Sequence, residues 1–125
     1  MPTLPEIVKT SWNNREGAVI FATVDQNGLP NAIYATCVSI YNDEMVVVAN
    51  NYFDKTIKNI QTGSKGSVLF MVKNGKTIQI KGSIKYFQDG PVYDDMKKWN
   101  PEKHPGHGAA AVIIEEVYSG AEKIM

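Results

Sequence analysis

The stretch Val46-Val47-Val48-Ala49-Asn50-Asn51-Tyr52-Phe53-Asp54-Lys55-Thr56, continued by Ile57-Lys58-Asn59-Ile60, decides how this chain is interpreted. An apolar strand ends in two asparagines, a short loop follows, and a helix then begins that carries Lys55 and Thr56. The first N–H groups of a helix are unpaired and carry a partial positive charge. Together with a lysine ammonium and a threonine hydroxyl, they predict a binding site for a phosphate group.

The composition predicts a single domain that spans residues 1–125, with 43% hydrophobic residues to form its core. Thirteen basic and thirteen acidic residues give a formal net charge of zero and are spread along the chain, which argues against nucleic acid and membrane as partners. Cys37 is the single cysteine, so we expect a buried, inert thiol and no internal disulfide. The chain lacks a signal-peptide pattern and an apolar run of about 20 residues, which is typical of a cytoplasmic protein.

Hydrophobic periodicity and turn signals predict six strands and three short helices. The expected strands are Ala18–Val24, Asn31–Tyr41, Met45–Ala49, Ser67–Val72, Thr77–Phe87 and Ala109–Glu116. The expected helices run from a Thr3–Glu6 capping box to about Asn13, over Asp54–Thr62 and over Val92–Trp99. The tail Val117–Met125 carries no clear pattern. Among the apolar residues expected to face the core are Ile7, Ile57 and Ile60 of the helices.

Short turns join most of these strands, which predicts antiparallel pairing. Asn42-Asp43 makes one tight turn, and Asn74-Gly75 is typical of a hairpin with a primed turn. Gly82 interrupts an alternating strand and predicts a bulge or a close backbone approach. Six antiparallel strands around one core close most naturally into a small barrel, because closure removes exposed edges.

This order of features resembles the FMN-binding split-barrel family, which includes pyridoxamine 5′-phosphate oxidase and small bacterial FMN-binding proteins. The resemblance extends from about Gly17 to Glu116. The segments that carry it are Ala18–Val24, Asn27–Asn31, Val46–Asn51 with Asp54-Lys55-Thr56, Gln79–Gly82 and the final strand. It implies a mainly β fold with short helices, a six-stranded antiparallel split β-barrel that binds FMN at the interface of a homodimer.

The resemblance also implies roles for individual residues. Lys55 and Thr56 would hold the FMN phosphate, with Asp54 beside them, and Gln79 would approach the cofactor from a neighbouring strand. The residues that would line the flavin are Ala32, Ile33, Tyr34, Ala35, Ala49, Asn50 and Asn51. Trp99 and His107 would come from the partner subunit. Without the resemblance, ordinary solvent-facing positions in a helix's first turn would be the favoured interpretation of Lys55 and Thr56.

Several functions stay open at this point. The second strand offers no Arg or Lys for a further phosphate, and the chain is much shorter than the pyridoxamine phosphate oxidases, so that activity itself is not expected. An FMN-dependent oxidoreductase or electron-transfer protein is one function. A non-redox barrel is another: a flavin carrier or sensor, or a binder of a deazaflavin or of haem with His104 or His107 as axial ligand. A barrel that only dimerises is a third.

A zinc site is a further alternative, because His104 and His107 lie near Glu102. Catalytic zinc needs three well-placed protein ligands. The Pro-Gly pair between the two histidines gives no regular ligand spacing, so the sequence argues against this alternative.

Overall fold

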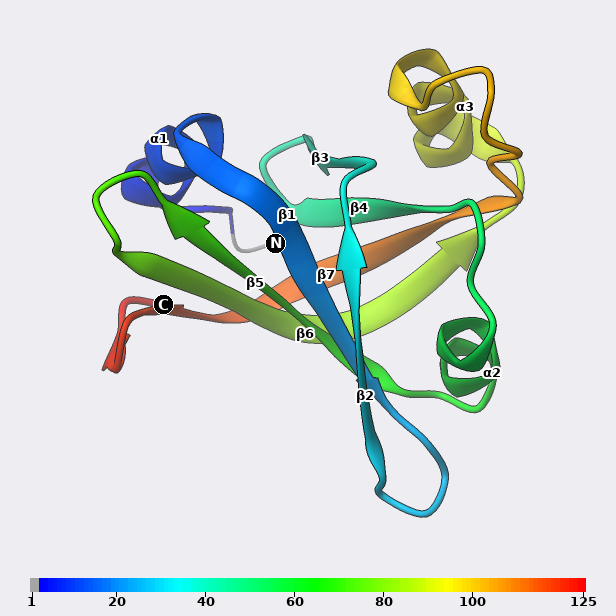
Figure 1. Ribbon diagram of the computed structural model, residues 1–125, viewed down its shortest axis with the longest axis horizontal. Coiled ribbons are helices and arrows are strands. Elements are labelled where there is room, and N and C mark those ends of the chain that lie inside the picture. The colour runs from blue at the N-terminus through cyan, green and yellow to red at the C-terminus, as the bar shows by residue number, and fades with distance from the viewer. Residues whose placement is uncertain (1–2) are drawn as a thin grey trace.

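The computed structural model describes residues 3–125, which form one curled antiparallel sheet with three short helices around it (Figure 1). The strands are β1 (Arg15–Val24), β2 (Pro30–Ala35), β3 (Val38–Tyr41), β4 (Met45–Asn50), β5 (Lys65–Val72), β6 (Thr77–Phe87), β7 (Gly108–Ser119) and β8 (Glu122–Lys123). The helices are α1 (Glu6–Asn13), α2 (Lys55–Gln61) and α3 (Gly90–Trp99). The strand order is β2-β1-β5-β6-β7-β4-β3, and β8 pairs with β7. No helix among these residues is both long and apolar enough to cross a bilayer.

The predicted fold class is confirmed as an antiparallel split barrel with short helices, but the prediction of six strands is wrong. The segment expected as one strand, Asn31–Tyr41, is broken at Thr36 and Cys37. The break lets the chain leave β1, with which β2 pairs, and continue as β3 beside β4 at the other end of the strand order. The unassigned tail adds β8. The remaining strands, with α2 and α3, lie where predicted, with ends that differ by at most three residues.

β4 is buried along its whole length, which explains its uninterrupted apolar sequence. Val46 and Val48 pack in the main core inside the curled sheet. The opposite face of β4 packs in a second cluster beneath α3, against Val92 and Met96. Packing on both faces fixes the position of Asn50, the last residue of the strand.

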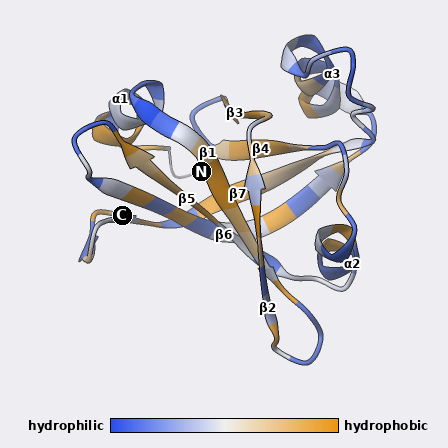
Figure 2. Ribbon diagram, viewed as in Figure 1, coloured by the Kyte–Doolittle hydropathy of each residue, from blue (hydrophilic) through white to orange (hydrophobic). Residues whose placement is uncertain are grey.

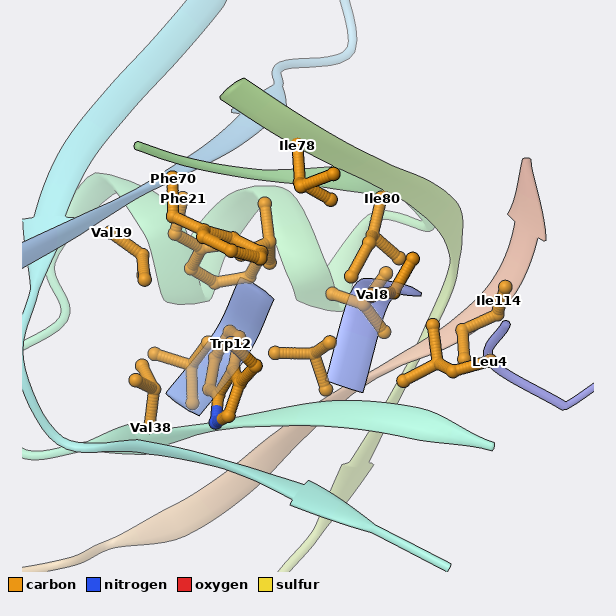
Figure 3. Close-up of a cluster of buried hydrophobic side chains, with 14 of the residues drawn as sticks. Leu4, Val8, Trp12, Val19, Phe21, Val38, Phe70, Ile78, Ile80 and Ile114 are labelled. Carbon is orange, nitrogen blue, oxygen red and sulfur yellow. The ribbon is translucent and has the colours of Figure 1, made fainter. Parts of the chain in front are cut away.

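The main core fills the inside of the curled sheet, and α1 contributes Val8 and Trp12 to it, with Leu4 from the segment just before the helix (Figure 3). The Trp12 ring meets Phe70 edge-on, with 5.2 Å between ring centroids. Val8 and Trp12 are four residues apart and share one face of α1. The prediction that Ile7 faces inward is therefore wrong, since its side chain is 56% exposed.

The predicted capping box is also wrong, because α1 begins later than its sequence suggested. Pro5, not Thr3, occupies the N-cap position, and a proline offers no side-chain acceptor for the first N–H groups. In α2 the most buried residues are Thr56 and Asn59, while the expected core residues Ile57 and Ile60 are only partly buried.

Two turn predictions have different outcomes. The bulge at Gly82 is confirmed, because the pairing of β6 with β7 shifts register between Lys81 and Gly82. The Asn74-Gly75 hairpin is present, but its primed geometry is not. Among residues 3–125, the non-glycine residues with positive φ are Asn42 at 51° and Asp43 at 55°. The left-handed pair typical of a primed turn therefore joins β3 to β4 instead.

Candidate functional site

Two surface hollows lie along β2, one at each end of the strand. The first, which we call the lysine hollow, has a volume of about 470 Å³. It is lined by Asp25, Gln26, Leu29, Pro30 and Asn31 on one side and by Lys55, Lys58, Asn59 and Thr62 on the other. The second, the aromatic hollow, has a volume of about 260 Å³. It is lined by Ile33, Tyr34, Ala35, Thr36 and Cys37 on one side and by Ala49, Asn51, Tyr52, Phe53 and His104 on the other.

The lysine hollow brings two ammonium groups and a side-chain amide together. Lys55 and Lys58 are three residues apart and so share one face of α2. Across the hollow, the Asn31 amide nitrogen donates a hydrogen bond to the Thr56 hydroxyl oxygen at 3.1 Å. Thr56 is only 1% exposed, so its hydroxyl lies behind the surface of the hollow and holds the Asn31 amide in place. Asp54 is exposed and precedes α2 at the N-cap position.

Asp25 adds one carboxylate to the lysine hollow. Its Oδ1 accepts the backbone N–H groups of Asn27 and Leu29, both at 2.9 Å. This oxygen is therefore engaged in the β1–β2 turn, which leaves the lysines as the groups that attract an anion.

The side-chain amides of Asn50 and Asn51 are both used inside the protein. Asn50 donates to the Tyr86 hydroxyl at 2.7 Å and accepts the backbone N–H of Phe53 at 3.0 Å. Asn51 and Asn100 exchange two hydrogen bonds, at 3.0 and 2.9 Å. Asn51 thus lines the aromatic hollow while its amide points to a partner within the fold.

The loop between α3 and β7 is held against the end of β4 by the same asparagine. Asn51 Oδ1 also accepts the backbone N–H of Gly106 at 3.0 Å. Within the loop, His104 Nδ1 lies 3.1 Å from the Tyr52 hydroxyl oxygen, and the two rings meet edge-on with centroids 5.5 Å apart. This loop therefore completes the rim of the aromatic hollow.

The structure brings six of the thirteen predicted site residues to the two hollows. Lys55 lines the lysine hollow. The aromatic hollow is lined by the other five, Ile33, Tyr34, Ala35, Ala49 and Asn51. Asn50 and Thr56 lie directly behind these surfaces, and Asp54 precedes α2.

The other four predicted residues lie elsewhere on the chain. Ala32 is exposed on the outer side of β2. Gln79 donates to the Ser67 hydroxyl at 3.1 Å in a third hollow, on β5 and β6. The half-buried Trp99 donates from its indole N–H to Asp95 at 3.3 Å. The exposed His107 uses its backbone N–H to bond the Asn50 carbonyl at 2.8 Å, so its imidazole lies outside both hollows of its own chain.

The third hollow contains an ion pair between Lys65 and Glu115, with 2.8 Å between Nζ and Oε1. Ser83 donates its hydroxyl to the other carboxylate oxygen at 2.5 Å. The hydrogen bond from Lys65, followed by that from Ser83, lowers the pKa of Glu115, and the same contact raises the pKa of Lys65.

Sequence reasoning missed several residues of the two hollows, among them Asn31, Lys58, Tyr52 and Phe53. Lys58 had a usable signal, because its spacing from Lys55 places both on one helix face. His104 was considered only as a metal or haem ligand, and the structure sets it against Tyr52. Within residues 3–125, no three His, Cys, Asp or Glu side chains come together as a metal site. The expectation of a buried Cys37 is wrong, since it is half-buried.

The sequence and the fold both have relatives. An uncharacterised protein of Methanocaldococcus jannaschii is 28% identical over 120 residues, which are 91% of this chain and 78% of that protein. The crystal structure of HupZ from Group A Streptococcus superposes with a TM-score of 0.79 at 21% identity, covering 93% of each chain. An FMN-binding protein from Syntrophomonas wolfei gives a TM-score of 0.75 at 22% identity, covering 88% of this chain and 81% of that one.

At these identities the two solved structures show a shared fold. The sequence match that identifies the family spans nearly the whole chain. Because residues 6–119 match the family model described as pyridoxamine 5′-phosphate oxidase, the chain belongs to that family.

Proposed function

We propose that the protein is an FMN-binding flavoprotein that serves as an oxidoreductase or an electron-transfer protein. The observation that carries this proposal is the pairing of the lysine hollow and the aromatic hollow along a single strand, β2. One hollow has the charge that a phosphate needs, and the other has the apolar, aromatic surface that a flavin ring needs.

The phosphate would lie in the lysine hollow. Lys55 and Lys58 supply positive charge, and Asn31, oriented by Thr56, supplies an amide. Charge-assisted hydrogen bonds from ammonium groups to phosphate oxygens are among the strongest that proteins make. The donors in this hollow therefore fit a phosphate monoester.

The flavin ring would lie in the aromatic hollow. Ile33, Ala35 and Ala49 offer a flat apolar surface, and Phe53 stands beside them. Asn31 and Ala35 are four positions apart on β2, which is roughly 13 Å at the usual rise of a strand. The ribityl arm of FMN together with part of the flavin ring covers such a distance, so one molecule can occupy both hollows.

FMN, when bound, supplies hydride or electron transfer, and the chain's residues bind and orient it and shield it from water. The aromatic hollow contains no lysine or arginine to hold a second phosphate group. We therefore do not propose pyridoxamine phosphate oxidase activity. The lone thiol of Cys37 suits the reducing cytoplasm, where we place the protein.

A second copy of the chain would complete the site. The outer face of β2, β1 and β5 presents an apolar surface, here called the outer apolar face. Figure 2 shows hydrophobic colouring along much of β1 and β5, whose residues face the core and the outer side in alternation. It consists of Ile20, Ala22, Val24, Ala32, Tyr34, Leu69 and Met71. Ile20 pairs with Tyr34 on one side and Leu69 on the other.

Tyr34 belongs to this outer face and also lines the aromatic hollow, with 79% of its side chain exposed. A hollow of about 260 Å³ is smaller than most ligand pockets, which measure roughly 300–1,000 Å³. A partner seated on the outer apolar face would therefore also wall off the flavin. This supports a homodimer with FMN at its interface.

Titration of the purified protein with FMN, followed by visible absorbance, tests the proposal. We expect saturable binding at micromolar concentration or below, and much weaker binding of riboflavin, which lacks the phosphate. Parallel titrations with a deazaflavin and with haem test the alternative ligands. If FMN does not bind at micromolar concentration, or if haem binds in its place, the proposed function is wrong.

A further inference from the structure

We propose that Tyr52 and His104 form a binding site for a second substrate, an uncharged aromatic molecule with an oxygen atom that accepts a hydrogen bond. The inference rests on the proposed function, because it places this molecule over the flavin at the mouth of the aromatic hollow. Three features support it: the hydrogen-bonding capacity of the pair, the way the fold holds the pair, and the charge of the hollow.

The pair always has one donor left for a ligand. His104 Nδ1 and the Tyr52 oxygen are 3.1 Å apart. In one tautomer the phenol donates to Nδ1, and the Nε2–H of the imidazole remains available. In the other tautomer Nδ1–H donates to the phenol oxygen, and the phenol O–H remains available. In either arrangement the pair can donate one hydrogen bond to an oxygen of a bound molecule.

The fold fixes the pair although its members are 52 residues apart in sequence. Tyr52 directly follows Asn51, whose amide bonds Asn100 on one side of His104 and Gly106 on the other. Both asparagines are buried, at 8% and 6% exposed. Tyr52 itself is 73% exposed, so its hydroxyl stands at the rim of the hollow. Groups held in this way meet a ligand at little entropic cost.

The charge of the hollow selects the class of ligand. None of its ten lining residues is Lys, Arg, Asp or Glu, in contrast to the neighbouring lysine hollow with Lys55, Lys58 and Asp25. Tyr34 and Tyr52, both largely exposed, supply aromatic surface for stacking at the mouth of the hollow. A charged group placed there would lose its hydration and gain only the single neutral hydrogen bond that the pair can donate. The hollow therefore fits a neutral aromatic molecule better than an acid or a phosphate ester.

A pair of probes with nearly the same shape tests this inference. 2-Acetylnaphthalene is a neutral ketone, and 2-naphthoate replaces its acetyl group with a carboxylate. Each is titrated by calorimetry into protein that has first been saturated with FMN, as judged by flavin absorbance. We expect the ketone to bind at least about tenfold more tightly than the carboxylate, which must give up its hydration.

Variants show whether the pair itself binds the ketone. Either residue alone keeps a donor, so the double variant Tyr52→Phe/His104→Phe is the one that removes the hydrogen bond. In protein saturated with FMN it should weaken ketone binding by about 2- to 10-fold, the worth of one neutral hydrogen bond. Tyr93→Phe removes the hydroxyl of a half-buried tyrosine on α3, outside the hollow, and should leave ketone affinity unchanged.

The outcomes separate this inference from the proposed function. Protein that cannot be saturated with FMN overturns the proposed function and this inference with it. Saturated protein that binds 2-naphthoate as tightly as the ketone, or fails to bind the ketone, overturns this inference alone. Ketone affinity that is the same in Tyr52→Phe/His104→Phe as in the unaltered protein also overturns it.

Discussion

Asn51 and Asn100 exchange two side-chain hydrogen bonds, at 3.0 and 2.9 Å, across 49 residues of sequence. Asn51 stands at the end of β4 and Asn100 at the end of α3, so the pair ties the loop before β7 to the centre of the sheet. A buried amide with its hydrogen bonds satisfied stabilises the fold modestly, but a buried amide left without a partner is strongly unfavourable. The pair thus fixes the geometry of the aromatic hollow.

Replacement of Asn100 by alanine should destabilise the protein by about 2–4 kcal/mol, because the buried Asn51 amide loses two hydrogen bonds and a cavity remains. Urea unfolding measures the free energy of unfolding. Asn27→Ala is the matched control, since Asn27 is exposed in the β1–β2 turn, and it should change stability by less than about 0.5 kcal/mol. Equal effects of the two substitutions would show that the amide pair has no structural role.

Replacement of Lys55 by alanine should weaken FMN binding by about 1.5–3 kcal/mol, the worth of a hydrogen bond to a charged group. Lys58→Ala should act in the same direction, because both lysines line the same hollow. Riboflavin affinity should stay constant in both variants, since riboflavin has no phosphate. Lys123→Ala, in the exposed strand β8, is the control for a general loss of positive charge. If riboflavin binding falls as much as FMN binding, the lysines do not contact the phosphate.

The fold was predictable where a short sequence pattern determines a local structure. The strand Thr77–Phe87 was predicted with both ends correct, because apolar residues alternate on either side of Gly82 and turn residues flank the segment at both ends. The break at Thr36 and Cys37 was not predictable, since these residues extend a β-like pattern and the break comes from the need to join two different neighbours in the sheet. Local propensity contains no information about such a choice of partner.

The candidate site, too, was predictable from the sequence only in part. Lys55 could be assigned to a surface site from its position after a strand and a loop, and it lines the lysine hollow. The Tyr52–His104 contact could not be predicted from the sequence, because it depends on how two loops pack across the end of β4. Residue type alone was a poor guide to the function of Asn50 and Asn51. Side-chain amides suit the edge of a flavin, but in this fold both amides form hydrogen bonds to other residues of the protein.

Gly82→Ala should destabilise the protein by about 3 kcal/mol or more, because the new methyl group would overlap the carbonyl oxygen of Ile113 and the neighbouring backbone of β7. Thermal or urea unfolding measures the loss. Gly63→Ala is an informative control, since Gly63 has a φ of 90° but open space around it. It should cost only about 1–2 kcal/mol, from backbone strain alone. A milder effect at Gly82 than at Gly63 would argue against the close contact between β6 and β7.

The Lys65–Glu115 pair predicts a specific pH dependence. Hydrogen bonds from Lys65 and then Ser83 lower the pKa of Glu115 in the folded protein. A carboxylate with a lowered pKa stabilises the fold at pH values above its unfolded pKa of about 4.3, and this contribution is lost as the pH falls through the folded pKa. Lys65→Met should therefore raise the Glu115 pKa measured by NMR titration. The stability difference between the two proteins should be present at neutral pH and shrink in acid. Lys76→Met, in the β5–β6 turn, should leave the Glu115 titration unchanged.

Met71→Glu should break the proposed homodimer. Met71 is 47% exposed on the outer apolar face, outside both hollows. A two-fold symmetric interface would bury the new carboxylate twice, once from each copy, without a partner of opposite charge. We expect light scattering to show a dimer for the unaltered protein and a dimer dissociation constant raised at least about 100-fold in the variant.

Ile7→Glu provides the matched control, because Ile7 is an aliphatic residue of similar exposure, 56%, on α1, which is not part of the outer apolar face. That variant should stay dimeric. FMN affinity should fall in Met71→Glu and not in Ile7→Glu, since the second copy covers the flavin in the proposed arrangement. A monomeric unaltered protein, or a Met71→Glu dimer as stable as the Ile7→Glu dimer, would place the interface elsewhere or remove it. Loss of the dimer with unchanged FMN affinity would instead show that one chain holds the flavin alone.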